Sequence, residues 1–226
     1  MKAISFHSRT LQFLALTLAA GLPAGLFFFR VFHTGHYTHG FLLWNLFLAW
    51  LPLIFAWFAL KIAPKSHLLA LFSAAAWLAF LPNAPYLITD IIHLRPIGDI
   101  PYFYDVVMFF SLALTGLALG FASLAWMQGV VRAKLGVWTA RIFAVTVIAM
   151  TSFGVYIGRF LRWNSWDILT NPGPLFLEIA RILHHPVAYR SIWAHVAVLT
   201  VMLLFSYGLL SIIPGLPDRT LQGKMS

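Results

Sequence analysis

Three side chains that can do acid–base chemistry or bind a cation lie close together in the sequence: Asp90, His93 and Asp105. Asp90 and His93 are three residues apart, so a helix would present both on one face. The segment that joins Asp90 to Asp105 is short enough to hold the two carboxylates near each other. General acid–base catalysis and divalent-cation binding both use carboxylates and imidazoles. We therefore take these three residues as candidate catalytic residues.

Two flanking segments carry polar groups suited to holding a substrate. Tyr86 lies one helical turn before Asp90, and Asn83 lies in a proline-rich break just before it. Farther along, Arg159 and Arg162 are expected on one helical face, where guanidinium groups can grip a phosphate or carboxylate through two hydrogen bonds. The candidate substrate-binding residues are Asn83, Tyr86, Arg159, Arg162, Asn164 and Asp167.

A structural role for the same charges is the alternative hypothesis. Asp90 and Asp105 would then pair with Arg95, Arg159 or Arg162 and tie helix ends together, and the Arg and Trp side chains would anchor the protein to lipid headgroups. Because a charge in hydrocarbon costs at least about 2.5–3.5 kcal/mol, partners or water are expected for each of them. The sequence leaves both hypotheses open.

The cofactor is not identified by the sequence. Since the chain has no cysteine, a thiolate nucleophile, a disulfide and a cysteine-ligated metal are excluded. A metal would need His, Asp or Glu ligands. His33, His36 and His39 recur every third residue, but this spacing follows no established zinc signature.

The composition points to lipid as the solvent. Hydrophobic residues make up 61% of the 226 residues and charged residues only 9%. Mean hydropathy is +0.86, and the apolar runs lack the alternation of a membrane β-barrel. We therefore expect an all-α fold: a polytopic bundle of about six transmembrane helices in a single integral membrane domain spanning 1–226. One of these helices should break at Pro82–Pro85. The expected spans are 11–32, 41–60, 67–81, 103–127, 138–160 and 191–213.

The distribution of charge predicts which end of the bundle faces the cytoplasm. The formal charge of +9 is spread among the helix ends, so it favours topology signals and lipid contacts over nucleic acid. Nine basic residues fall on the side of the two termini and six on the other, which places both termini in the cytoplasm. Five of the six acids fall on the opposite side. A cleaved signal peptide is the alternative for the first span.

Two glycine pairs predict close helix packing. Gly116 and Gly120 are four residues apart, as are Gly154 and Gly158. This spacing lets helices approach closely, either within the chain or against a membrane protein partner or a second copy. Membrane lipids are the other expected partners.

Four segments resemble the signature of a known family. They are Asn45-Leu-Phe-Leu-Ala-Trp, Pro82-Asn-Ala-Pro-Tyr-Leu-Ile-Thr-Asp90, Tyr104-Asp105 and Gly158-Arg-Phe-Leu-Arg-Trp-Asn-Ser-Trp-Asp167. The chain is similar, over roughly Trp44 to Trp193, to a bacterial multi-pass membrane family catalogued as a domain of unknown function. The resemblance implies a protein of the bacterial inner membrane. It implies no activity, cofactor or catalytic residue.

Three functions fit these observations. The leading hypothesis is a membrane-embedded enzyme, open to the extracytoplasmic side, that acts on an anionic or lipid-linked substrate, for example by hydrolysis. The second is a small transporter in which the broken helix lines a path and the acids relay protons or cations. The third is an accessory protein whose polar cluster is structural.

Overall fold

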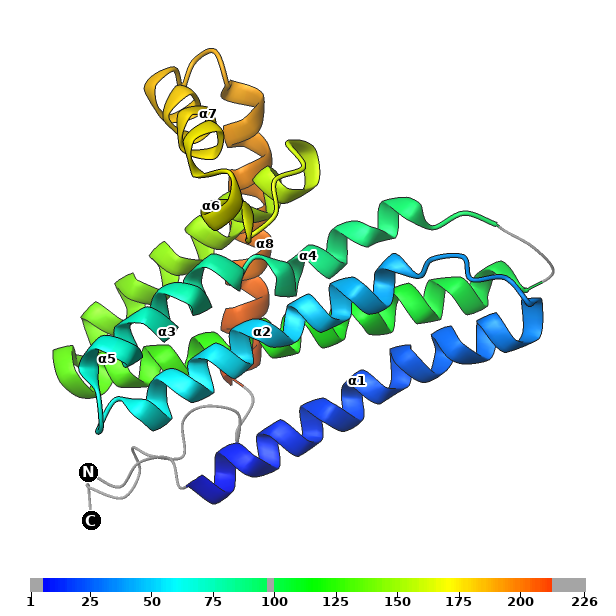
Figure 1. The fold of residues 1–226 in the computed structure, drawn as a ribbon, viewed down its shortest axis with the longest axis horizontal. Coiled ribbons are helices and arrows are strands. Elements are labelled where there is room, and N and C mark those ends of the chain that lie inside the picture. The colour runs from blue at the N-terminus through cyan, green and yellow to red at the C-terminus, as the bar shows by residue number, and fades with distance from the viewer. Residues whose placement is uncertain (1–5, 97–99, 213–226) are drawn as a thin grey trace.

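The computed structural model describes residues 6–96 and 100–212, and the elements in these two ranges are helices (Figure 1). The predicted all-α membrane bundle is therefore confirmed. In chain order the elements are α1 (Phe6–Thr34), α2 (Phe41–Ile62), α3 (His67–Phe80), α4 (Asn83–Thr89), the 3-10 helix η1 (Asp90–His93), α5 (Tyr102–Phe160), α6 (Asp167–Thr170), α7 (Pro172–His184) and α8 (Arg190–Ile212).

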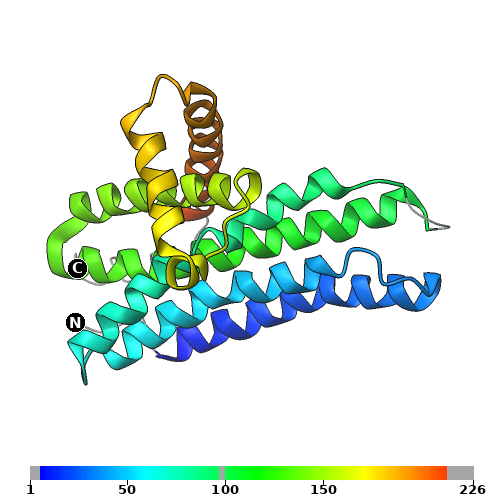
Figure 2. The same cartoon turned by 45° about the horizontal axis from the view of Figure 1, so that its top comes forward.

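Five helical segments of the described chain are long and apolar enough to cross a membrane. The longest, α5, is two helices joined at Gly136, where the chain turns back on itself (Figure 2). Helices thus cover the six segments expected to span except for Leu81, which follows α3, and residue 213, which lies outside the described ranges. The turn at Gly136 falls inside the expected connection at 128–137, but it is shorter than expected, because the helix continues to the residue before Gly136. Gly136 ends it with φ +87°, a backbone conformation that favours glycine.

The predicted break in the third span is present, but it is mild. α3 ends at Phe80 and α4 begins at Asn83, with Leu81 and Pro82 both in helical dihedral angles between them. Pro85 lies in the first turn of α4, where a missing N–H costs little. Leu87 and Ala84 of α4 are fully buried, so the segment after the break packs in the bundle core.

The glycine pairs pack against this broken helix in the same chain. A Cβ added at Gly116 would overlap the carbonyl oxygen of Ala84, and one added at Gly154 would overlap Pro82. At Gly120 the added Cβ would lie 3.0 Å from the Cβ of Ala84. Both halves of α5 therefore approach α4 and the break closely because they carry glycine.

The carboxyl-terminal elements form an arm across the bundle. α1, α2, α3–α4 and the two halves of α5 run roughly side by side, whereas α7 and α8 stand out from them (Figures 1 and 2). α8 packs against α5. On α7, Leu175 and Ile182 are buried while Phe176, Leu177 and Leu183 are exposed. This helix therefore leaves apolar side chains uncovered beside its charged residues, as an interfacial helix does.

Candidate functional site

Arg159, in the last turn of α5, is the centre of a polar cluster at the end of the bundle. Its Nη2 lies 3.2 Å from Oδ1 of Asp90 and also donates to the carbonyl oxygen of Thr89. Its Nη1 donates to the Tyr86 hydroxyl at 3.1 Å and lies 3.3 Å from Nε2 of His93. The guanidinium also stacks 4.9 Å from the centre of the Tyr86 ring. The cluster joins the end of α5 to α4 and η1.

Asp90 is closed off by its partners. Its other carboxylate oxygen, Oδ2, accepts a hydrogen bond of 2.9 Å from Nδ2 of Asn45 on α2. Asp90 is only 1% exposed. Each carboxylate oxygen thus has a donor from a different helix, which satisfies a buried charge.

Asp105 belongs to a second cluster with a different arginine. Nε and Nη2 of Arg30, on α1, donate to its two carboxylate oxygens at 2.7 and 3.2 Å. Arg30 also donates to the hydroxyl of Thr38. Both charged side chains are almost completely buried. The expected grouping of Asp90 with Asp105 as neighbouring carboxylates is therefore replaced by two ion pairs, each with its own arginine.

His39 lies between the two clusters. It follows α1, with a left-handed backbone conformation (φ +66°), and its ring packs edge-on against Phe109 at 5.3 Å. Burial lowers the pKa of His39, the charge of Arg30 lowers it further and Asp105 opposes this. His93, which touches Arg159, lowers it by its charge and raises it by a backbone hydrogen bond. The net effect lowers the pKa of His39 and favours its neutral form beside the Arg30–Asp105 pair.

The second candidate segment forms a tight turn after α5. α5 ends at Phe160 and Arg162 takes a left-handed conformation (φ +61°), so the expected helical face shared with Arg159 is wrong. Arg162 is exposed and pairs with no acid of the described chain. Asp167 accepts from the backbone N–H of Asn164 at 2.7 Å and from the Thr170 hydroxyl at 3.1 Å. These hydrogen bonds lower the pKa of the Asp167 carboxyl.

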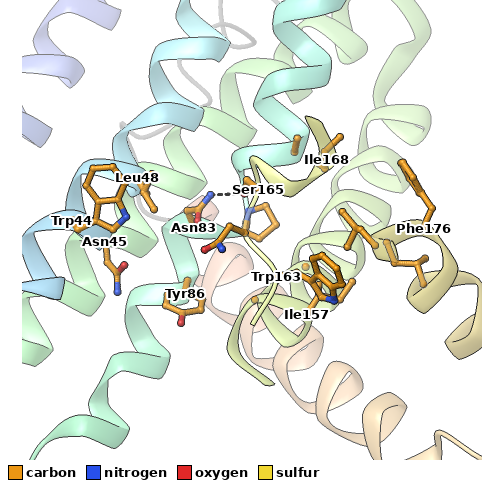
Figure 3. A pocket seen from close by; sticks show the side chains of 17 residues that line it. Trp44, Asn45, Leu48, Asn83, Tyr86, Ile157, Trp163, Ser165, Ile168 and Phe176 are labelled. Carbon is orange, nitrogen blue, oxygen red and sulfur yellow. Dashed lines mark hydrogen bonds between the residues drawn. The ribbon is translucent and has the colours of Figure 1, made fainter. Parts of the chain in front are cut away.

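A cleft of about 240 Å³ lies beside the Arg159 cluster, between α2, the α3–α4 break, the turn after α5, and α7 (Figure 3). Its walls include Asn45 and Tyr86, whose side chains also contact Asp90 and Arg159. Trp44 and Phe176 line it and are more than half exposed, so the cleft is open at this edge. The other polar lining side chains are Asn83, Asn164 and Ser165. Asn83, at the start of α4, donates to Ser165 in the turn after α5 at 2.9 Å.

The candidate residues divide into a lining set and a supporting set. Asn83, Tyr86 and Asn164 line the cleft, whereas Asp90, His93, Asp105, Arg159, Arg162 and Asp167 are not among its lining residues. Within residues 6–96 and 100–212, no three His, Asp or Glu side chains gather closely enough to hold a metal ion.

Residues 44–209 match the model of a family described as Protein of unknown function (DUF1361). The chain belongs to this family. No curated protein and no solved structure matches it. The DUF1361 region contains the whole cleft and the Asn45–Asp90–Arg159 cluster. It also contains Asp105 but begins after Arg30, so the second ion pair joins the DUF1361 region to the helix that precedes it.

Sequence reasoning missed two residues of these clusters. Arg30 is the only charged residue between Arg9 and Lys61, and a lone charge inside an apolar run signals a buried partner. Asn45 had a weaker signal, as an amide one turn inside an otherwise apolar helix. Neither signal identifies the partner residue, which is 75 positions from Arg30 and 45 positions from Asn45 in the sequence.

Proposed function

We propose that this is a membrane protein of the bacterial inner membrane that binds the headgroup of a lipid or lipid-linked molecule in the cleft beside Arg159. The cleft is the observation that supports this proposal most directly. It combines amide and hydroxyl groups with tryptophan side chains, and one of its walls is α7. Binding sites for small molecules typically have mostly apolar walls with a few polar groups that fix orientation.

The surroundings of the cleft favour an amphiphile. Phe176 lines the cleft on α7, and the next residue, Leu177, is 61% exposed. Trp44 and Phe47 on α2 are also about half exposed. These apolar surfaces would contact acyl chains while the headgroup enters the polar cleft. At about 240 Å³ the cleft is smaller than the roughly 300–1,000 Å³ of a drug-sized pocket. This size suits a headgroup alone.

In this proposal the two ion pairs position helices and do not react with substrate. Arginine donates to both carboxylate oxygens of Asp105 and to one of Asp90. Both residues are at most 1% exposed. A buried carboxylate held in this way lacks the open approach that a nucleophile or base needs. Neither the hydrolytic nor the transport hypothesis has an observation as specific as the cleft in its favour.

The proposal places the cleft on the extracytoplasmic side, with both termini in the cytoplasm. The excess of basic residues on the side of the termini supports this orientation. A protein partner or second copy, if one binds, would use surfaces other than the four glycines, because these already contact the chain's own α4, Pro82, Tyr86 and Trp163.

Lipid retention by cleft-filling variants tests the proposal. Ile168 lines the cleft, whereas the next residue, Leu169, does not line it and is 85% exposed. Ile168→Trp should therefore fill the cleft and Leu169→Trp should not. Native mass spectrometry of the purified protein should show a bound lipid in the wild type and in Leu169→Trp and its loss in Ile168→Trp. Equal retention by both variants would overturn the proposal.

A further inference from the structure

We infer that the group bound in the cleft is uncharged and rich in hydroxyl groups, as the headgroup of a glycolipid or polyol lipid is. This inference rests on the proposed function and names the class of ligand. It comes from the hydrogen-bonding groups that the protein leaves free in the cleft walls.

Three asparagines present hydrogen-bond acceptors. Nδ2 of Asn45 donates to Asp90, Nδ2 of Asn83 donates to the Phe80 carbonyl oxygen, and Nδ2 of Asn164 donates to Asp167. Because each partner atom is an acceptor, the amide orientations are fixed. No residue in the described ranges donates to the three Oδ1 atoms. The residues that line the cleft therefore include three amide oxygens to which no described residue donates.

Hydroxyl and indole groups present donors in the same cleft. The Tyr86 hydroxyl accepts from Arg159, and the Ser165 hydroxyl accepts from Asn83, so each retains its own proton to donate. The indole N–H groups of Trp44 and Trp163 are also unused by described residues. A wall of mixed donors and acceptors suits hydroxyl groups, because each hydroxyl both donates and accepts.

The absence of charge in the walls disfavours an ionic headgroup. None of the residues that line the cleft within the described ranges is acidic, basic or histidine. Arg159 is not a lining residue, donates to the Tyr86 hydroxyl and is already paired with Asp90. A phosphate would meet three carbonyl oxygens and would lack a charged donor, while an ammonium group would add a cation next to Arg159. An uncharged group needs no charged donor and adds no cation next to Arg159.

Aromatic side chains complete the fit to a sugar. Trp44 comes from α2 and Trp163 from the turn after α5, and they lie on different walls of the cleft (Figure 3). A pyranose ring has polar edges and apolar C–H faces, so it can stack on an indole while its edges bond to amides. The volume of about 240 Å³ limits the ligand to a small group such as one ring.

Photolabelling by three matched probes tests the inference. The full-length protein in lipid nanodiscs is labelled with alkyl glucoside, alkyl phosphate and alkyl trimethylammonium probes that share one diazirine-bearing chain. Labelled peptides from residues 161–179 are quantified by mass spectrometry. The glucoside should label this segment roughly tenfold more than either ionic probe, as a difference of one good polar contact would produce. Ile168→Trp should abolish this labelling, and Leu169→Trp should leave it unchanged.

A second pair of variants controls for misfolding. Trp163→Leu removes the stacking ring and should lower glucoside labelling about five- to tenfold, whereas Trp163→Phe keeps an aromatic face and should retain most of it. Labelling by an ionic probe that equals glucoside labelling and is lost in Ile168→Trp would overturn this inference and support the proposed function. Labelling that is insensitive to Ile168→Trp with all three probes would overturn both.

Discussion

Arg30 of α1 and Asp105 of α5 form a buried ion pair through two parallel hydrogen bonds, of 2.7 Å from Nε and 3.2 Å from Nη2. The two residues are 75 positions apart, and both side chains are at most 2% exposed. The side-on arrangement matches the planar fork of a guanidinium to a carboxylate. Since α1 packs mainly against α5, this pair fixes the carboxyl-terminal end of α1 to the bundle.

Removing one partner of this pair should destabilise the protein strongly. Arg30→Met leaves the Asp105 carboxylate buried without its charged partner and should lower the free energy of unfolding by about 3–5 kcal/mol. The double variant Arg30→Met/Asp105→Leu removes both charges and should recover most of this loss. Thermal unfolding of the detergent-solubilised variants measures both effects. A single variant as stable as the wild type would contradict the structural role given to the pair.

Asn45 should matter through its hydrogen bond to Asp90. Asn45→Leu removes the 2.9 Å bond to the carboxylate and should cost about 1.5–3 kcal/mol of unfolding free energy. Phe47→Leu, two residues along α2 at a position that is 51% exposed, is the control and should have little effect. Equal unfolding temperatures for the two variants would show that Asn45 does not support Asp90.

Acid should loosen the turn that carries Asn164 and Asp167. The native hydrogen bonds hold the pKa of Asp167 below its ordinary value of about 3.9, so they stabilise the turn fully above that pH. This contribution should be lost as the pH falls through the lowered pKa. The protection factors of residues 161–171, which compare each exchange rate with the intrinsic rate at the same pH, should therefore fall in acid for the wild type. Asp167→Asn should have low protection factors already at neutral pH, and a variant with high protection factors at every pH would contradict the assignment.

The glycine contacts predict opposite results for two Gly-to-Ala changes in helices. At Gly116 the added methyl group meets the backbone of Ala84, so Gly116→Ala should destabilise the protein by about 1–3 kcal/mol. At Gly25 an added Cβ has nothing within 4 Å, so Gly25→Ala should be neutral or stabilising. Unfolding in detergent measures the difference. A neutral Gly116→Ala would mean that α5 and α4 can separate without cost.

The sequence predicts the helices well because lipid imposes a strong pattern on it. Apolar runs of about twenty residues, ended by Lys61, Pro64 or Pro96, mark where helices begin and end. The turn within α5 is shorter than the connection expected at 128–137, because residues 128–135 carry no proline and continue the helix beyond the apolar run. The chain reverses direction at Gly136, whose φ is positive. The sequence alone does not distinguish this glycine from those at which the chain does not reverse.

The ion-pair partners of the buried acids were harder to predict than the helices. Arg159 with Asp90 was one of the pairings that the structural hypothesis allowed, and the structure contains it. Arg30 with Asp105 is not among those pairings, since helix order alone does not say which helix lies beside α1. The cleft is not visible in the sequence, because its walls come from segments as far apart as Trp44 and Phe176.

The central claim, that the cleft holds a specific headgroup, is tested most directly by photocrosslinking in native membranes. Phe176 and Leu177 are neighbours on α7 with similar exposure, 57% and 61%, but only Phe176 lines the cleft. Each is replaced in turn by p-benzoylphenylalanine, and the masses of the crosslinked adducts are measured by mass spectrometry. We expect one dominant lipid adduct from position 176 and a mixture that follows bulk membrane composition from position 177. The same bulk mixture at both positions would contradict the claim.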